Sequence, residues 1–90
     1  MTINVYVVTI ETTARDWGKT SFEVKGVWPT FEKALEYLQQ KKSEEDKWRH
    51  DSGDSNTGCI DVRNDSARWY YGDWDCLYEY RIDMTEYHND

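Results

Sequence analysis

The stretch from Arg68 to Met84 holds the side chains best suited to chemistry or binding, with two Trp and four Tyr among four carboxylates. Asp73 and Asp75 are close in sequence, and such a pair can act as general acid and general base when one carboxyl is desolvated. The composition favours charged surface residues instead, and two His leave little else that titrates near neutral pH. The chain has no nucleophile elbow, glycine-rich phosphate loop or H-E-x-x-H motif. We therefore expect a protein that is not an enzyme.

The cysteine and histidine side chains are too scattered for a zinc site. His50, Cys59, Cys76 and His88 lack the closely spaced pairs of ligands that zinc sites use. We expect the two cysteines to be buried, reduced thiols that pack as small apolar groups. A disulfide between them stays open only if their strands are neighbours, because it needs Cα atoms within about 7 Å.

The polar loop at 50–58 invites comparison with a calcium loop, since it contains Asp54 and Asn56. In the EF-hand pattern, glycine stands at position six and glutamate at position twelve. Counted from Asp54, Gly58 stands at position five and Asp65 at position twelve. We expect a solvated loop with no bound metal, and no other cofactor in the protein.

The aromatic residues of the 68–84 stretch are expected to divide between core and surface. The core group is Trp69, Tyr78 and Tyr80, and the surface group at the turn is Tyr70, Tyr71 and Trp74. Exposed aromatic side chains surrounded by carboxylates match the composition of an interface hot spot for a basic partner. Spaced carboxylates can also replace phosphates in a channel lined by Arg and Lys. The residues expected to contact a partner are Asp61, Asp65, Tyr70, Tyr71, Asp73, Trp74, Asp75, Glu79 and Asp83.

The charge is distributed unevenly along the chain. Residues 1–50 carry eight acidic and eight basic residues, whereas residues 51–90 carry ten acidic and three basic ones, so the second half holds the whole net charge of −7. Such a field repels nucleic acids and anionic membranes and attracts basic surfaces. We therefore expect a protein partner with a basic surface, and neither direct nucleic-acid binding nor membrane binding.

Residue alternation predicts how the 76–84 strand is oriented. Cys76, Tyr78, Tyr80, Ile82 and Met84 fall on one face, which we expect to be core, and the residues between them fall on the other. Gly72 lies in the turn that precedes this strand, and the tail 85–90 is expected to be frayed. The last strand thus presents carboxylates to solvent.

The first half predicts a hairpin followed by a helix. Strands are expected at 3–10 and 21–28, and alternation places Phe22, Val24 and Trp28 on one side of the second strand. Pro29 ends that strand and Thr30 is a suitable helix cap. Helical spacing of apolar residues runs from 31 to 38, and Trp48 is the one later residue that can anchor the helix end.

The second half predicts three further strands, at 59–63, 67–71 and 76–84, with a turn at 64–66. Because helices do not alternate with the strands, we expect an antiparallel sheet of four to five strands, in the order ββαβββ, with one amphipathic helix on one face. This α+β fold would form a single domain over residues 1–90.

Two segments, VYVVT at 5–9 and EKALEYL at 32–38, are similar to a recurrent pattern in small phage proteins. In those proteins a VYVVT strand precedes a hairpin, a T-x-E-K-A-x-x-Y helix and C-terminal strands. The resemblance implies a phage or mobile-element origin. Small acidic phage proteins of this size often resemble inhibitors of host nucleic-acid enzymes, including anti-CRISPR, anti-restriction and glycosylase-inhibitor proteins. The resemblance carries over that functional class and no individual inhibitor's motif.

We therefore expect a small acidic interaction protein of the anti-CRISPR type. It would inhibit a nucleic-acid-binding defence enzyme, such as a CRISPR nuclease, by occupying its basic surface. The alternative is a small ligand-binding or sequestering module whose aromatic residues stack on a planar ligand. Because no signal peptide or membrane-spanning run is visible, we expect a soluble protein of the bacterial host cytoplasm. Steric blocking, nucleic-acid mimicry and homodimer formation through an edge strand stay open.

Overall fold

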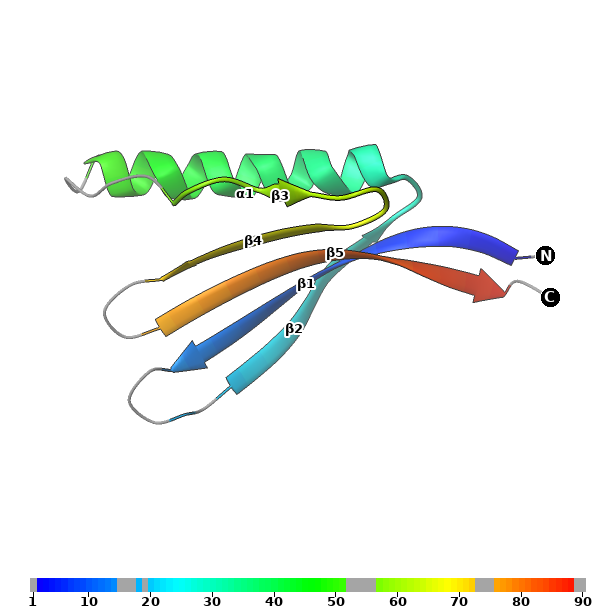
Figure 1. The fold of residues 1–90 in the computed structure, drawn as a ribbon, viewed down its shortest axis with the longest axis horizontal. Coiled ribbons are helices and arrows are strands. Elements are labelled where there is room, and N and C mark those ends of the chain that lie inside the picture. The colour runs from blue at the N-terminus through cyan, green and yellow to red at the C-terminus, as the bar shows by residue number, and fades with distance from the viewer. Residues whose placement is uncertain (1, 15–17, 19, 52–56, 73–75, 89–90) are drawn as a thin grey trace.

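The computed structural model describes residues 2–14, 18, 20–51, 57–72 and 76–88, with the side chains of His50 and Asp51 excepted. The elements are β1 (Thr2–Ala14), β2 (Thr20–Trp28), α1 (Phe31–Asp51), β3 (Asp61–Val62), β4 (Ala67–Gly72) and β5 (Cys76–His88) (Figure 1). The strands form one antiparallel sheet in the order β2-β1-β5-β4-β3, and α1 packs on it. The expected α+β architecture is confirmed.

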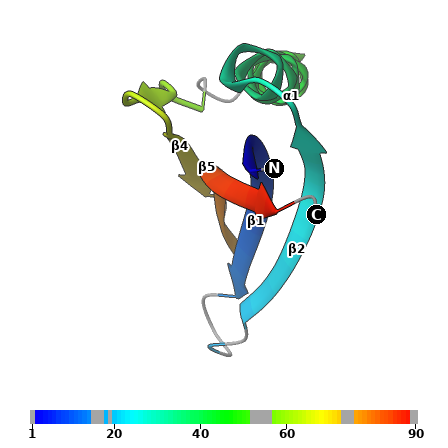
Figure 2. The same ribbon diagram turned by 90° about the vertical axis from the view of Figure 1, so that its right-hand side faces the viewer.

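The sheet curves around the helix. Figure 2 shows β2 and β4 rising toward α1 on either side of β1 and β5. The enclosed face carries the core, in which the largest fully buried side chains are Val8, Leu38, Trp69 and Ile82. Burying a side chain of this size stabilises the fold by about 1.5–3 kcal/mol. Among the described residues, no helix covers the opposite face of the sheet.

The first turn of α1 forms as the sequence predicts. The backbone N–H of Lys33 donates to Thr30 Oγ1 at 3.2 Å, which is the bond expected of a helix-capping threonine. Ala34 and Leu38, one turn apart, are completely buried against the sheet. The cap and the helical spacing therefore set both the start of α1 and the side that it turns to the core.

Charged residues, and not Trp48, hold the end of α1. Trp48 is 61% exposed, so the expectation that it anchors the helix end is wrong. Thr57 donates to Asp46 Oδ1 from its backbone N–H at 2.8 Å, and also from its hydroxyl. Arg49 is buried, with its guanidinium 5.2 Å from the centre of the Tyr71 ring. Hydrogen bonds and a cation–π contact thus replace the missing apolar stripe.

A β-bulge in β2 separates residues that simple alternation would place together. The pairing changes from Val8↔Gly26 to Thr9↔Val24, so Lys25 has no opposite residue in β1. An extra residue reverses the side-chain alternation beyond it. Bulges and edge lysines also discourage pairing with another strand, and β2 lies at the edge of the sheet.

The bulge moves Trp28 to the opposite face from Phe22 and Val24, so the expected grouping of these three side chains is wrong. Phe22 and Val24 are 67% and 54% exposed. Trp28 instead packs against Tyr37 of α1, with ring centres 4.7 Å apart. A Cβ atom on Gly26 would lie only 2.5 Å from the Trp28 ring, so a residue without a side chain is needed there.

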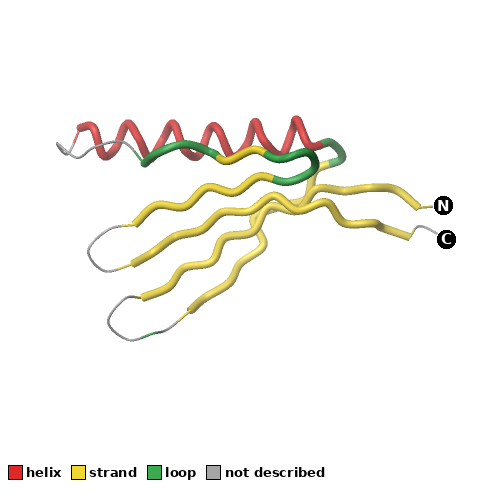
Figure 3. The backbone as a smooth tube through the Cα atoms, viewed as in Figure 1, coloured by secondary structure: helices red, strands yellow, loops and turns green. Residues whose placement is uncertain are grey.

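The tail after Met84 is part of the sheet, so the expectation of a frayed end at 85–88 is wrong. β5 pairs with β1 along its whole length, from Ala14↔Cys76 to Thr2↔His88. Thr2 Oγ1 lies 3.1 Å from His88 Nδ1 at the end of this ladder. The first residues of β1 pair with this tail, and composition alone does not reveal that pairing. Figure 3 shows this two-stranded end extending beyond the helix.

Three smaller expectations can also be compared with the structure. The strand expected at 59–63 is only Asp61–Val62, while the turn that follows is closed by a bond from Arg63 N to Ser66 O at 2.8 Å. Cys59 is exposed and Cys76 only partly buried, so the expectation of two buried thiols is wrong, and no disulfide joins them. Within the described part of the chain, no helix has the length and apolar character to cross a membrane.

Candidate functional site

The face of the sheet opposite α1, called here the helix-free face, is organised around one row of four side chains. Tyr70, Glu79, Glu11 and Phe22 lie directly opposite one another on β4, β5, β1 and β2. Side chains of such opposite residues lie on the same side of a sheet. The row therefore places two carboxylates in the middle and an aromatic ring at each end.

The rings of this central row are exposed. Tyr70 is 69% exposed and Phe22 67%, and Val24, Val27 and Leu77 of the same face are also largely open to solvent. Single exposed apolar residues are ordinary, but a group on one face is typical of an interaction surface. The helix-free face thus has the exposed apolar area that protein binding requires.

A second row of side chains crosses the helix-free face beside the central row. It carries most of the positive charge of that face. Its members are Asp61, Arg68, Arg81, Thr9 and Val24. Arg68 and Arg81 lie directly opposite each other, and both donate to Glu79, Arg68 at 3.1 Å. Two like charges in this position would repel each other without the shared carboxylate.

Ion pairing lowers the pKa of Glu79. Partial burial acts to raise the pKa, but hydrogen bonds from Arg68 and Arg81 outweigh it and hold the pKa below its usual range. Glu79 is therefore ionised at neutral pH, and its charge is used within the sheet. Glu11, the other carboxylate of the central row, has no ion pair among the described residues.

A hollow of about 300 Å³ opens on this face beside the central row. Its lining includes Glu11, Tyr70, Leu77 and Glu79. Arg68, which also lines the hollow, lies 5.9 Å from the centre of the Tyr70 ring and contacts one face of it. The hollow thus combines an exposed aromatic ring with Glu11, a carboxylate that has no ion pair within the described part of the chain.

The structure brings some of the expected contact residues together and separates others. Tyr70 and Glu79 are neighbours in the central row, Asp61 belongs to the second row, and Asp83 lies opposite Val7 on the same face. Asp65 is exposed in the turn before β4. Asp73, Trp74 and Asp75 lie outside the described residues.

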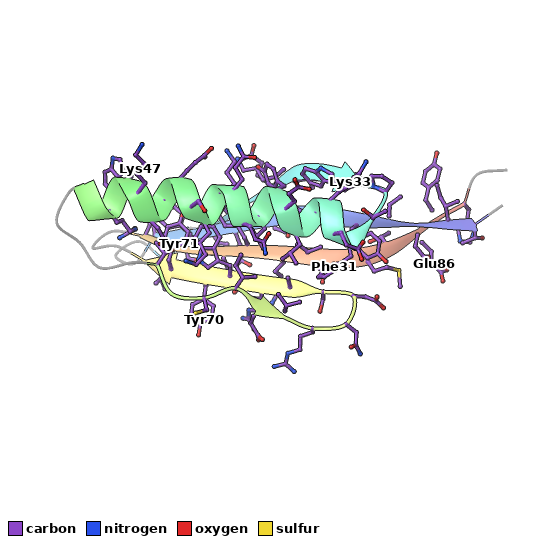
Figure 4. All side chains as sticks on the ribbon, turned by 90° about the horizontal axis from the view of Figure 1, so that it is seen from above. Phe31, Lys33, Lys47, Tyr70, Tyr71 and Glu86 are labelled. Atoms are coloured by element: carbon purple, nitrogen blue, oxygen red, sulfur yellow. The ribbon has the colours of Figure 1, made fainter. Side chains whose placement is uncertain are left out.

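Tyr71 does not belong to this surface, so its expected exposure at the turn is wrong. Because β4 continues to Gly72, Tyr70 and Tyr71 point to opposite faces. Tyr71 stacks on Tyr78 with ring centres 5.0 Å apart, and burial raises the pKa of its hydroxyl. Figure 4 shows Tyr71 beside the helix and Tyr70 on the far side of β4.

Two residues of the central row, Glu11 and Phe22, were missed from the sequence. Alternation assigns Glu79 to the solvent face, but only the pairing register of β1 with β5 shows that Glu11 lies beside it. A register of this kind depends on the length of pairing between distant segments, which has no local signal.

Among the described residues, no group of three or more His, Cys, Asp or Glu side chains is placed to hold a metal ion. The chemistry available on the helix-free face is therefore that of carboxylates, guanidinium groups and aromatic rings. Comparison with protein-family models, curated proteins and solved structures finds no match for this chain.

Proposed function

We propose that this protein is a small acidic inhibitor of a bacterial defence enzyme that binds nucleic acid, of the anti-CRISPR type. It would act in the host cytoplasm by docking its helix-free face on the basic nucleic-acid-binding surface of the enzyme. The observation that carries this proposal is the central row, with Glu11 and Glu79 between the exposed rings of Tyr70 and Phe22.

The central row suits an arginine or lysine side chain of a partner. Glu11 supplies a carboxylate without an ion pair among the described residues, and Tyr70 supplies a ring face. A cation placed between them gains a charge-assisted hydrogen bond and a cation–π contact. Leu77 and Phe22 exclude water around such a contact, as the apolar rim of a hot spot does.

The arginines of the second row favour direct docking over imitation of a phosphate backbone. A phosphate mimic presents a series of unneutralised negative charges. On the helix-free face Glu79 is bonded to Arg68 and Arg81, and Asp61 lies 3.5 Å from Arg63. Alternating charges of this kind fix the orientation of a protein partner and add specificity.

The negative charge around the central row also favours a basic partner. Asp65, Asp83 and Glu86 are exposed and have no ion pair among the described residues. They contribute to the net charge of −7, which accelerates encounter with a positive surface. The choice of a defence enzyme as partner comes from the resemblance of the first strand and the helix to small phage proteins.

Affinity capture from a bacterium that carries CRISPR and restriction systems tests the proposal. The wild type is compared with Glu11→Lys and with Glu32→Lys, which makes the same charge change on the exposed side of α1. We expect the wild type and the control to retain one nucleic-acid-binding enzyme, and Glu11→Lys to lose it. The enzyme's own nucleic-acid substrate should displace the captured protein. An enzyme that binds its substrate while captured contradicts the proposal, as does capture of no basic protein.

A further inference from the structure

A second cavity lies on the other face of the sheet, beneath the C-terminal half of α1. Its volume is about 430 Å³, within the range of roughly 300–1,000 Å³ typical of small-molecule sites. It is lined by Ile10, Glu45, Trp48, Arg49, Tyr71, Tyr78 and Tyr80. These residues come from α1, β1, β4 and β5, so the folded sheet and helix together form the cavity.

Aromatic rings provide the walls. Tyr71 and Tyr78 stack on the sheet with their rings inclined by 24°, and Tyr80 stacks in turn on buried Trp69. Trp48 faces them from the helix side, and it is 61% exposed. An indole left this open at the mouth of a cavity has apolar area that a planar ligand would cover.

Arg49 and Glu45 provide the polar groups. Arg49 is buried, and its Nε forms an ion pair with Glu45 Oε1 at 3.3 Å. Nε makes no hydrogen bond among the described residues, and the atom is closed to solvent. A buried donor without an acceptor is costly, so a ligand acceptor that reaches Nε through a small shift of the Arg49 side chain would remove that cost.

The hydroxyls of Tyr71 and Tyr80 add two neutral polar groups to the residues that line the cavity. Burial raises the pKa of Tyr71 and of Tyr80, and the nearby charge of Glu45 adds to the effect at both. Both phenols thus remain protonated at neutral pH. The cavity offers guanidinium and hydroxyl donors beside one carboxylate acceptor.

The charges in the cavity cancel. Arg49 and Glu45 carry opposite charges, and no further Lys, Arg, Asp or Glu lines the cavity within the described part of the chain. A phosphate group would meet one guanidinium that already pairs with a carboxylate. The cavity is therefore suited to an uncharged molecule.

We propose that this cavity binds an uncharged, planar heteroaromatic molecule of the nucleoside class. Such a base stacks on the exposed Trp48 indole, as bases stack on aromatic side chains in other proteins, and lies beside Arg49, whose guanidinium already covers the Tyr71 ring. Its edge carries donors and acceptors side by side, which match Glu45 and Arg49. This site lies on the opposite side of the sheet from the proposed docking face, although Tyr71 and Tyr78 line the hollows on both sides.

Titration of the protein with adenosine, guanosine, cytidine and uridine tests the proposal, with the matching 5′-monophosphates as charged counterparts. Binding is followed by the NMR signal of the Trp48 indole. We expect at least one nucleoside to bind saturably, and its monophosphate to bind about tenfold more weakly or worse. Absence of saturable binding by all four nucleosides, or equal or tighter binding of the monophosphate, would overturn the proposal.

Substitutions locate the site. Trp48→Ala should weaken nucleoside binding by about tenfold or more, followed by the backbone amide signals, with little change in stability because the indole is largely exposed. The control Lys47→Ala changes the neighbouring residue, which Figure 4 shows on the side of the helix away from Tyr71, and it should leave binding unchanged. Binding that survives Trp48→Ala would overturn the assignment. Glu11→Lys should also leave it unchanged, which separates this site from the docking face.

Discussion

Glu11 of β1 and Glu79 of β5 lie directly opposite each other on the helix-free face, and within the described part of the chain arginines bond to Glu79 but not to Glu11. Two carboxylates in this position repel each other unless cations offset their charge. Arg68 and Arg81 bring two positive charges to Glu79, so little repulsion of Glu11 remains. Glu11 thus lies beside an exposed tyrosine with no ion pair among the described residues, an arrangement that a binding role would explain.

Replacement of Glu11 by Gln should therefore change the free energy of unfolding by no more than about 0.5 kcal/mol, because Arg68 and Arg81 already offset the charge of Glu79. Urea denaturation measures this change, and Glu32→Gln on the exposed helix surface serves as the control. A loss of stability in Glu11→Gln would mean that its carboxylate has a structural partner.

Replacement of Glu79 by Gln should destabilise the protein. It leaves Arg68 and Arg81 facing each other without the negative charge that they share. Because both arginines are about half exposed, solvent screening limits the cost to about 1 kcal/mol. A double-mutant cycle with Arg68→Gln should show coupling between the two sites, and strictly additive effects would contradict the shared ion pair.

The stability of the protein should fall at acid pH in part because Asp46 becomes protonated. Burial acts to raise the pKa of Asp46, but bonds from Lys42 and Thr57 hold it at about 2, below the ordinary 3.8. Because the folded-state pKa is depressed, this stabilisation is present above pH 3.8 and disappears as the pH falls toward about 2. Asp46→Asn should lose about 1–2 kcal/mol at pH 7.

The difference between wild type and Asp46→Asn should then shrink between pH 4 and pH 2, measured by urea denaturation at each pH. A difference that stays constant across this range would show that the carboxylate charge is not what holds Thr57 to the helix.

Gly26→Ala should destabilise the protein by about 1–3 kcal/mol, because the new methyl group overlaps the Trp28 ring. The Trp28 ring must then move out of its contact with Tyr37. Thermal unfolding measures the cost. In a Trp28→Leu background the same substitution should cost much less, and an equal cost in both backgrounds would contradict the steric cause.

Local patterns were enough to predict the elements and the orientation of the last strand. Alternation places Leu77, Glu79 and Arg81 away from the core, and Thr30 caps the helix, as the structure confirms. These features depend on interactions between residues that are close in sequence. Residue periodicity and capping residues therefore predict them directly.

Long-range pairing is what local patterns could not predict. The opposition of Glu11 to Glu79 depends on how β1 and β5 align, and the position of Trp28 depends on the bulge at Lys25. The turn expected around Gly72 predicts an exposed Tyr71, whereas β4 extends through that glycine and turns Tyr71 toward the helix side. These three differences concern the face or the register of a strand, which tertiary contacts decide.

The most direct test of the docking face is a titration of the captured enzyme's activity. The inhibitor is the wild type, the face variant Glu11→Lys/Tyr70→Ala, or the control Glu32→Lys/Trp48→Ala, which reverses one charge and removes one exposed ring on α1 instead. We predict that the control inhibits like the wild type. The face variant should need about 100-fold more protein for the same inhibition, as loss of a hot-spot pair does. Equal potency of the face variant and the wild type would contradict docking through the helix-free face.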